Sequence, residues 1–187
     1  MFSLGLMRAI TNHKSLTLLI IMLSARLISA DPQTEQIRKA AAENSAAYTS
    51  GNYSRLVDLT YPKLVEMIGG RDEMIEMLRS GTEEMKAHGS AILGVEVSDP
   101  KEVVTAGDKR FAIVPEIVRI QISAGTLRSK GFLIAISEDR GKTWTFIDGA
   151  GLHKTPGKER QTLEQIVPGF PSQLSLPPWE PPVLEPQ

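Results

Sequence analysis

The spacing of apolar residues changes along the chain, from a helical repeat in the first half to strict alternation in the second. Between residues 33 and 88, apolar side chains recur every three or four positions, and glycine or proline residues divide this stretch. The pattern predicts helices over 33–50 and 71–88. Two shorter helical segments are expected between them, the first capped by Ser54 and the second beginning at Pro62.

Methionine is frequent in this helical half, at positions 67, 74, 77 and 85. These residues follow the helical spacing beside isoleucine and leucine, a pattern typical of an adaptable core. We therefore expect the methionines to pack in the interior and not to bind a soft metal.

Beyond residue 90, apolar and polar residues alternate, as in strands with one buried face. The pattern predicts strands at 93–97, 103–105, 109–123, 127–137 and 142–148. Pro115 interrupts the longest of them and indicates a bulge or an edge position, because proline cannot donate to a ladder. Helices followed by antiparallel strands predict an α+β fold in which the N-terminal helices cover the sheet.

The first thirty residues have the order of a cleavable secretory signal. Arg8 and Lys14 precede an apolar run at 16–23, and the small residue Ala30 marks the cleavage site. The run is far shorter than the roughly 20 residues that cross a membrane as a helix, so we expect no stable membrane anchor after cleavage. The alternative, a short buried helix, would need an amphipathic face that this run lacks. The sequence thus predicts a signal over 1–30, an α+β domain over 31–151, and a short helix with a proline-rich tail over 152–187.

Charge and composition argue against several classes of function and of site. Without residues 1–30 the chain keeps 18 basic and 22 acidic residues, and this balance argues against nucleic-acid binding, which needs clustered Lys and Arg. The chain has no cysteine, which excludes disulfides and thiolate ligands. His88 and His153 have no carboxylates at ligand spacing, so neither a metal nor a cofactor is expected. We expect an exported protein, periplasmic or extracellular.

The last thirty residues are rich in proline but are not polar. A short helix is expected over 158–167, and seven prolines from Pro168 onward force extended chain. A disordered tail is one interpretation. The apolar residues between the prolines favour another, a tail laid across the domain or a partner, with Phe170 and Trp179 as candidate binding residues.

A short motif lies between the last two expected strands. Residues 137–144 fit the Asp-box pattern Ser-x-Asp-x-Gly-x-Thr-Trp of sialidase-like propellers. Asp139 can accept hydrogen bonds from turn amides, Gly141 allows a positive φ, and Trp144 can pack beneath the loop. In propellers the motif recurs in blade after blade, but here it occurs once, in a chain too short for several blades. We interpret it as a structural turn and not as a sign of sugar chemistry.

Two stretches, AAYTSGNY at 46–53 and GGRDEMI at 69–75, together with the order of elements, resemble the nuclear transport factor 2-like superfamily, also called the SnoaL-like or cystatin-like cone fold. The resemblance covers about residues 33–150. It implies a curved antiparallel sheet wrapped round a long helix, with a pocket that different members use for isomerisation, dehydration, hydrolysis, ligand binding or dimerisation. Such a fold does not by itself determine a function.

The resemblance also implies that a catalytic member would hold an acid or base inside the cone, where desolvation shifts its pKa. The catalytic candidates are Tyr61, His88 and Glu116, whereas Tyr48 and Arg119 are candidates for binding; Glu96 is a further polar candidate. Each has a structural alternative. Tyr48 suits a core aromatic, His88 a helix cap, and Glu116 with Arg119 an exposed charge pair.

Two functions from different classes remain open. We expect a non-catalytic exported module that binds a small molecule or a protein. The alternative is a cofactor-free lyase, isomerase or hydrolase that uses an acid–base pair such as Tyr61 with Glu116 or His88. A homodimer formed through the open sheet face is a third possibility. Convergence of two such side chains in one apolar pocket is the feature that discriminates between binding and catalysis.

Overall fold

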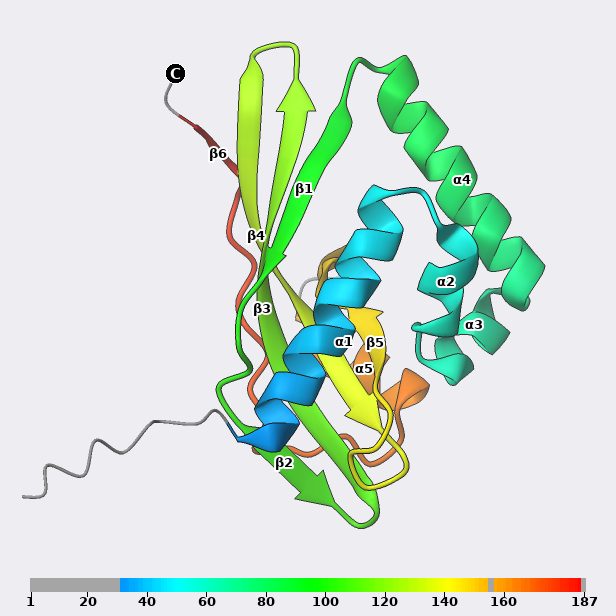
Figure 1. The fold of residues 1–187 in the computed structure, drawn as a ribbon, viewed down its shortest axis with the longest axis vertical. Coiled ribbons are helices and arrows are strands. Elements are labelled where there is room, and N and C mark those ends of the chain that lie inside the picture. The colour runs from blue at the N-terminus through cyan, green and yellow to red at the C-terminus, as the bar shows by residue number, and fades with distance from the viewer. Residues whose placement is uncertain (1–30, 155–156, 186–187) are drawn as a thin grey trace, which may run out of the picture.

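The computed structural model describes residues 31–154 and 157–185, so the expected signal at 1–30 lies outside the described residues. The helices come first, as Figure 1 shows: α1 (Pro32–Thr49), α2 (Tyr53–Asp58), α3 (Pro62–Ile68) and α4 (Arg71–Ala87). Five strands follow: β1 (Ala91–Val97), β2 (Val103–Ala106), β3 (Lys109–Ile122), β4 (Gly125–Ser137) and β5 (Thr145–Asp148). The chain continues through the 3-10 helix η1 (Gly149–Lys154), α5 (Glu159–Ile166) and the short strand β6 (Val183–Leu184). The predicted α+β class, with N-terminal helices on a curved antiparallel sheet, is confirmed.

Local sequence signals set the helix starts. The Asp31 side chain accepts a hydrogen bond from the Gln33 amide at 3.3 Å, and Pro32 occupies the first turn of α1. The cap of α2 is Asn52, whose side chain accepts from the Arg55 amide at 3.2 Å. The prediction of Ser54 as this cap is wrong, because the helix begins at Tyr53 and already includes Ser54.

Helix α4 lies at the outside of the molecule, against α2 and α3 (Figure 1). Its one buried side chain is Met74, whereas Met77 is 49% exposed, and Met67 of α3 is 54% exposed. The expectation of a methionine core is therefore wrong for Met67 and Met77. A helix covered along only one side leaves part of its apolar stripe in solvent.

The sheet has the order β1-β3-β4-β5, with β2 paired to β3 and β6 paired to β4, all antiparallel. Pro115 of β3 stands opposite Phe132 of β4 with no shift in register, so no bulge forms there. Its carbonyl accepts from the Ser98 amide at 2.9 Å, on the side of β3 that carries β1 and β2. In an antiparallel strand the N–H of a residue points to the same side as its carbonyl. The missing N–H therefore faces the gap between the end of β1 and the start of β2, which is locally an edge position.

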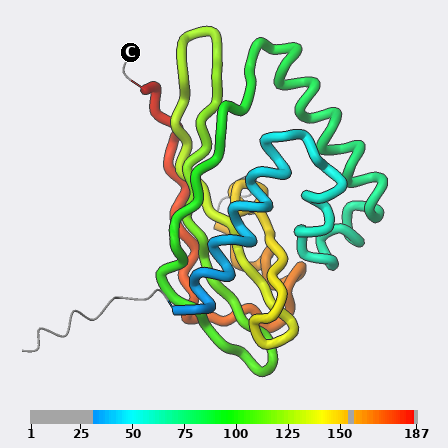
Figure 2. Tube along the Cα trace, viewed as in Figure 1, coloured from blue at the N-terminus to red at the C-terminus, as the bar shows by residue number. Residues whose placement is uncertain are grey.

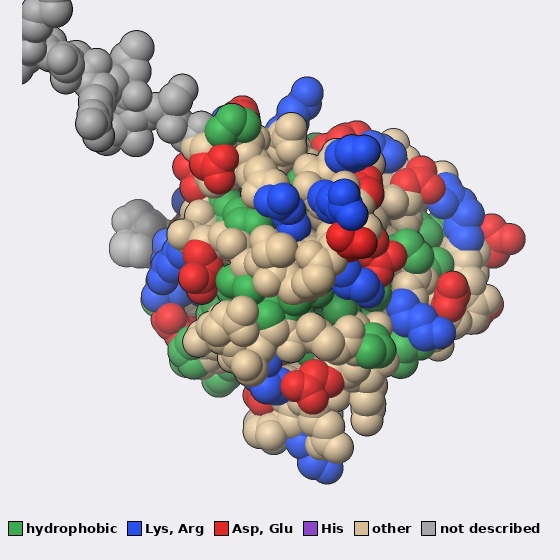
Figure 3. Space-filling model, turned by 90° about the horizontal axis from the view of Figure 1, so that it is seen from below, with side chains coloured by type: hydrophobic (Ala, Val, Ile, Leu, Met, Phe, Trp, Pro, Cys, Tyr) green, Lys and Arg blue, Asp and Glu red, His purple; other side chains and the backbone are tan. Residues whose placement is uncertain are grey.

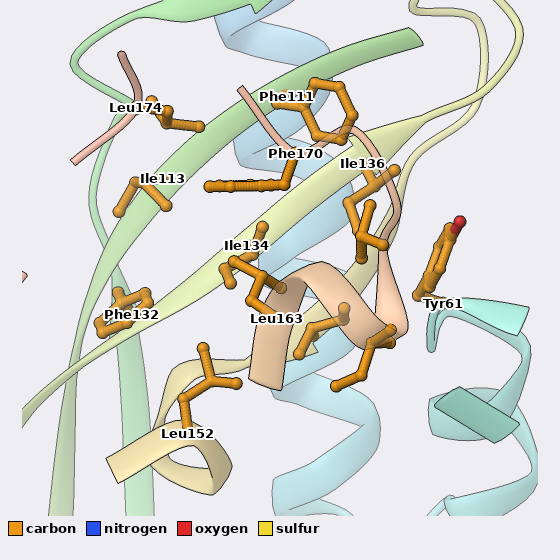
Figure 4. Close-up of a cluster of buried hydrophobic side chains, with 13 residues drawn as sticks. Tyr61, Phe111, Ile113, Phe132, Ile134, Ile136, Leu152, Leu163, Phe170 and Leu174 are labelled. Carbon is orange, nitrogen blue, oxygen red and sulfur yellow. The ribbon is translucent and has the colours of Figure 1, made fainter. Parts of the chain in front are cut away.

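Both faces of the sheet are covered. Phe132, Ile134 and Ile136 of β4 point to one face and pack with buried residues of η1, α5 and the segment after α5. Leu133 and Ala135 point to the other face and pack with residues of α1. We call the face against α1 the inner face and the face against α5 the outer face. Figure 4 shows α5 in front of the strands and α1 behind them.

The C-terminal segment completes the outer face. Leu163, Phe170 and Leu174 are buried among the outer-face side chains of β3 and β4 (Figure 4). Beyond them the chain runs along the sheet toward the end of the β3–β4 hairpin (Figure 2), where β6 pairs with residues 127–128 of β4. The tail is thus laid across its own domain.

The loop between β4 and β5 forms the expected turn. Asp139 Oδ1 accepts from the amides of Lys142 at 3.0 Å and Thr143 at 2.9 Å, and Oδ2 accepts from the Thr143 hydroxyl at 2.7 Å. These bonds, those from Thr143 foremost, hold the pKa of Asp139 well below its ordinary value. Gly141 has a φ of 92°, and Trp144 is buried in the inner-face core.

Candidate functional site

A cavity of about 160 Å³ lies between the N-terminal helices and the inner face of the sheet. Apolar side chains of α2, α3, α4 and the strands form most of its lining. The polar lining residues are Asn44, Ser45 and Tyr48 of α1, Thr60 between α2 and α3, Glu116 of β3 and Asp148 of β5.

Glu116 reaches the cavity because of strand alternation. It lies on the inner face with Val114 and Val118, two positions to either side, and it is only 8% exposed. Its partner across the ladder is Gly131 of β4. A Cβ atom at position 131 would stand 3.0 Å from Glu116 Oε1, so the missing side chain of Gly131 makes room for the carboxyl group.

Burial, followed by the negative charge of Asp148, raises the pKa of Glu116 to about 8. At neutral pH Glu116 is therefore mainly a neutral carboxylic acid, with one O–H donor and a carbonyl acceptor. A buried carboxyl group with a pKa in this range can bind a ligand by hydrogen bonding or exchange a proton with it.

Two residues of α1 add neutral hydrogen-bonding groups. Burial, together with the charge of Asp148, raises the pKa of Tyr48, which stays a phenol at neutral pH. The Ser45 hydroxyl oxygen is buried and has no hydrogen-bond partner among the described residues. The cavity thus offers a carboxylic acid, a phenol and an unsatisfied hydroxyl in a mainly apolar lining that also includes Asn44, Thr60 and Asp148.

The structure does not bring the expected acid–base pairs together. The Tyr61 hydroxyl donates to Glu138 Oε1 at 3.1 Å, and Glu138 also binds Lys109 Nζ at 2.7 Å. The ring of Tyr61 packs in the outer-face core, as Figure 4 shows. His88 is exposed at the C-terminal end of α4, with Nδ1 2.8 Å from a backbone carbonyl of that helix. Neither residue lines the cavity of Glu116.

Arg119 belongs to the opposite face of the sheet. It forms ion pairs with Glu96 and with Glu185, the latter at 3.1 Å between Nε and Oε1. Because Glu116 and Arg119 are three residues apart on a strand, their side chains point to opposite faces. The interpretation of these two residues as an exposed charge pair is therefore wrong.

The two tail candidates have different environments. Phe170 is buried in the outer-face core, where its ring meets that of Phe111 edge-on with 5.5 Å between centroids. This packing leaves Phe170 no surface for a partner. Trp179 is 62% exposed.

Sequence reasoning missed Ser45 and Asp148 and assigned Tyr48 and Glu116 to separate roles. Helical spacing placed Asn44 and Tyr48 on one stripe of α1, a signal for a shared face. The second signal was the alternation of side chains along β3, which places Glu116 and Arg119 on opposite faces of the sheet. Which face would be buried depended on contacts distant in sequence.

Other site types find no support in the described part of the chain. Within residues 31–154 and 157–185, no three His, Cys, Asp or Glu residues are grouped so as to hold a metal ion. None of the helices in these ranges has the length and apolar character to span a membrane. On the face seen from below in Figure 3, basic and acidic side chains are interspersed and form no large area of a single sign.

Comparison with known proteins gives a likeness of fold. No protein-family model matches the chain, and no curated protein matches it. The chain is similar to the crystal structure of an NTF2-like protein with a cystatin-like fold from Novosphingobium aromaticivorans, at 19% sequence identity and a TM-score of 0.41. The match covers 62% of this chain and 77% of that chain.

Proposed function

We propose that the protein is a non-catalytic binding module for a compact small molecule that carries a hydrogen-bond acceptor. The observation that carries this proposal is Glu116, a carboxyl group buried in an apolar cavity and raised in pKa to about 8. In its neutral form it can donate a hydrogen bond to a ligand oxygen or nitrogen.

The unsatisfied hydroxyl of Ser45 supports the same proposal. A buried polar group without a partner costs about 1–3 kcal/mol, and a ligand that supplies the partner recovers part of this cost. Binding energy would therefore come from both polar recognition and burial of the apolar body of the ligand.

The volume limits the size of the ligand. At about 160 Å³ the cavity is smaller than the roughly 300 Å³ or more of a drug-sized site. An apolar cavity of about 150 Å³ is enough for benzene. We therefore expect a single-ring or similarly compact molecule.

Filling the cavity tests the proposal. The full chain is screened by ligand-observed NMR against small ketones and amides and their hydrocarbon analogues. Ser45→Leu places a large side chain in the cavity and should abolish binding of the ketones and amides, whereas Ala46→Leu, on the exposed side of the same helix, should leave it unchanged. Equal binding of the hydrocarbon analogues, or unchanged binding by Ser45→Leu, would contradict the proposal.

A second candidate is acid–base catalysis without a cofactor, by Glu116 with Tyr48 in place of the pairs expected from sequence. The observation that favours it is that a pKa of about 8 lies in the working range of a general acid or base. Glu116→Gln keeps a neutral hydrogen-bonding group but cannot exchange the proton. Conversion of a bound compound by the wild type, lost in Glu116→Gln while binding persists, would establish catalysis. Binding without conversion in both proteins would favour the binding module.

Export is also a proposal, carried by the residue order in 1–30. We expect mass spectrometry of the protein from the periplasm or the medium to show a chain that begins at Asp31. Recovery of the protein only from the cytoplasm, with residues 1–30 still attached, would contradict export.

A further inference from the structure

A second cavity, of about 600 Å³, lies on the outer face of the sheet beneath the C-terminal tail. Its floor includes Ile113, Pro115 and Phe132, and tail residues from Leu174 to Glu180 form its other side. We call this cavity the tail groove and residues 175–180 the strap. Glu116 contributes to the lining of both cavities from within β3, so the sheet itself separates the two.

The strap is held at both ends. At its start, Arg160 Nη2 donates to the Leu174 carbonyl at 2.7 Å, and the Leu174 side chain is buried in the outer-face core. At its end, Glu180 pairs with Lys130 at 2.7 Å, and β6 then joins the edge of β4. The tail therefore crosses the groove as a strap anchored at both ends. Figure 2 shows the course of the tail along the sheet.

The groove contains one basic side chain that no other described residue pairs with, and a histidine beside Glu159. Arg128 is half-buried and has no hydrogen bond or ion pair within the described residues, although it lies two positions from Lys130 on the same face of β4. His153 Nδ1 is buried without a hydrogen-bond partner in the described chain, 3.9 Å from Glu159 Oε1. Both residues line the groove.

The charges indicate what the groove attracts. Beyond Glu116, whose side chain points to the inner face, and His153, the charged lining residues are Lys101, Glu102, Arg128, Lys130 and Glu180, an excess of one positive charge. An unpaired guanidinium presents a planar fork of donors that matches a carboxylate, and it gains most where an apolar surround excludes water. The single excess charge matches a monoanion better than a phosphate monoester, whose charge at neutral pH approaches −2.

We propose that the tail groove is a second binding site, which takes an elongated, mainly apolar molecule with one carboxylate. The carboxylate pairs with Arg128, and the apolar body lies on Ile113 and Phe132 beneath the strap. The volume falls in the range of ligand sites, roughly 300–1,000 Å³. The distance from Arg128 to Phe132 along β4 is on the order of 13 Å, which suits a linear rather than a compact molecule.

Decanoate is a suitable probe, and isothermal titration calorimetry of the full chain measures its binding. We expect saturable binding that weakens about 10–100-fold in Arg128→Gln, the loss typical of a charge-assisted hydrogen-bonded pair. Arg128→Lys keeps the positive charge but lacks the planar fork of donors. Its affinity for decanoate should therefore lie between those of the wild type and Arg128→Gln. The matched control is Arg140→Gln, in the β4–β5 turn, where the guanidinium pairs with Asp108; it should bind as the wild type does.

Analogues and an inner-cavity variant complete the test. Decanol should bind more weakly than decanoate because it lacks the charge, and decyl phosphate should not bind more tightly. Ser45→Leu should leave decanoate binding unchanged, which separates this site from the inner cavity. Absence of saturable binding, equal affinity in a folded Arg128→Gln variant, or tighter binding of decanol or decyl phosphate would overturn the proposal.

Discussion

At the scale of single residues, Glu116 is the feature that departs most from an ordinary core. Its carboxyl group is buried on the inner face, with room provided by the missing side chain of Gly131. Burial disfavours the charged form, so the residue is kept neutral rather than paired with a cation. Because the pKa of Glu116 is raised in the folded protein, the stability of the protein depends on pH.

Replacement of Glu116 by glutamine should remove this dependence. The folded-state pKa is raised from 4.5 to about 8, so between these values the folded protein binds more protons than the unfolded chain. The free energy of unfolding of the wild type should therefore fall as the pH rises from about 5 to 8, by at most about 5 kcal/mol. Glu116→Gln should show little of this fall. Urea unfolding at a series of pH values measures it.

The control for this prediction is Glu164→Gln, a change of the same chemistry at an exposed position of α5. It should retain the wild-type fall in stability. Equal slopes in wild type and Glu116→Gln would show that Glu116 is charged in the folded protein at neutral pH.

At the scale of elements, the β4–β5 turn depends on one carboxylate. Asp139 accepts hydrogen bonds from two amides and two hydroxyl groups, those of Ser137 and Thr143. These bonds join the end of β4 to the start of β5 and place Trp144 in the inner-face core. The motif is therefore explained by the turn alone.

We expect Asp139→Ala to lower the melting temperature at neutral pH. Because the pKa of Asp139 is lowered in the folded state, the stability it contributes is present above the ordinary range of aspartate and is lost as the pH falls through the lowered value. The difference in melting temperature between wild type and variant should therefore shrink below about pH 4. Circular dichroism thermal melts measure it.

Asp108→Ala serves as the comparison, because Asp108 is an exposed residue that pairs with Arg140 at the same end of the sheet. Its effect should be close to zero, as is usual for exposed ion pairs. If both variants melted alike, the turn would not depend on the Asp139 bonds.

At the scale of the whole molecule, the C-terminal segment behaves as part of the core. Leu163, Val167, Phe170 and Leu174 are buried against the outer face of β3 and β4, so residues beyond 151 share a core with the preceding domain. The predicted division into a domain over 31–151 and a separate tail over 152–187 can be tested by truncation.

A chain that ends at residue 156 should lose cooperative unfolding, because the apolar outer face of β3 and β4 would be exposed to water. It should also bind a dye specific for exposed apolar surface. A chain that ends at residue 178 keeps α5 and Leu174 and should unfold cooperatively. Differential scanning calorimetry of both chains decides: cooperative melting of the shorter chain at the wild-type temperature would establish 31–151 as an independent domain.

The fold was predictable to a large extent because its signals are local. Alternation from Phe132 to Ile136 was enough to define a strand and the side chains that share its face, and Pro62 marked the start of α3. The site was less predictable. Tyr61 was a candidate from the sequence, but its hydroxyl group donates a hydrogen bond to Glu138, which is 77 positions away along the chain.

Residues within a few positions of one another were therefore enough to predict the main helices, the five strands from β1 to β5 and the Asp139 turn, but not every helix cap. The tertiary structure alone decided which strand face carries the buried acid, through the packing of α1 and the space at Gly131. It also decided that the tail covers the sheet and encloses a groove. Burial and the pKa of Glu116 depend on neighbours that are distant in sequence, and no local pattern records them.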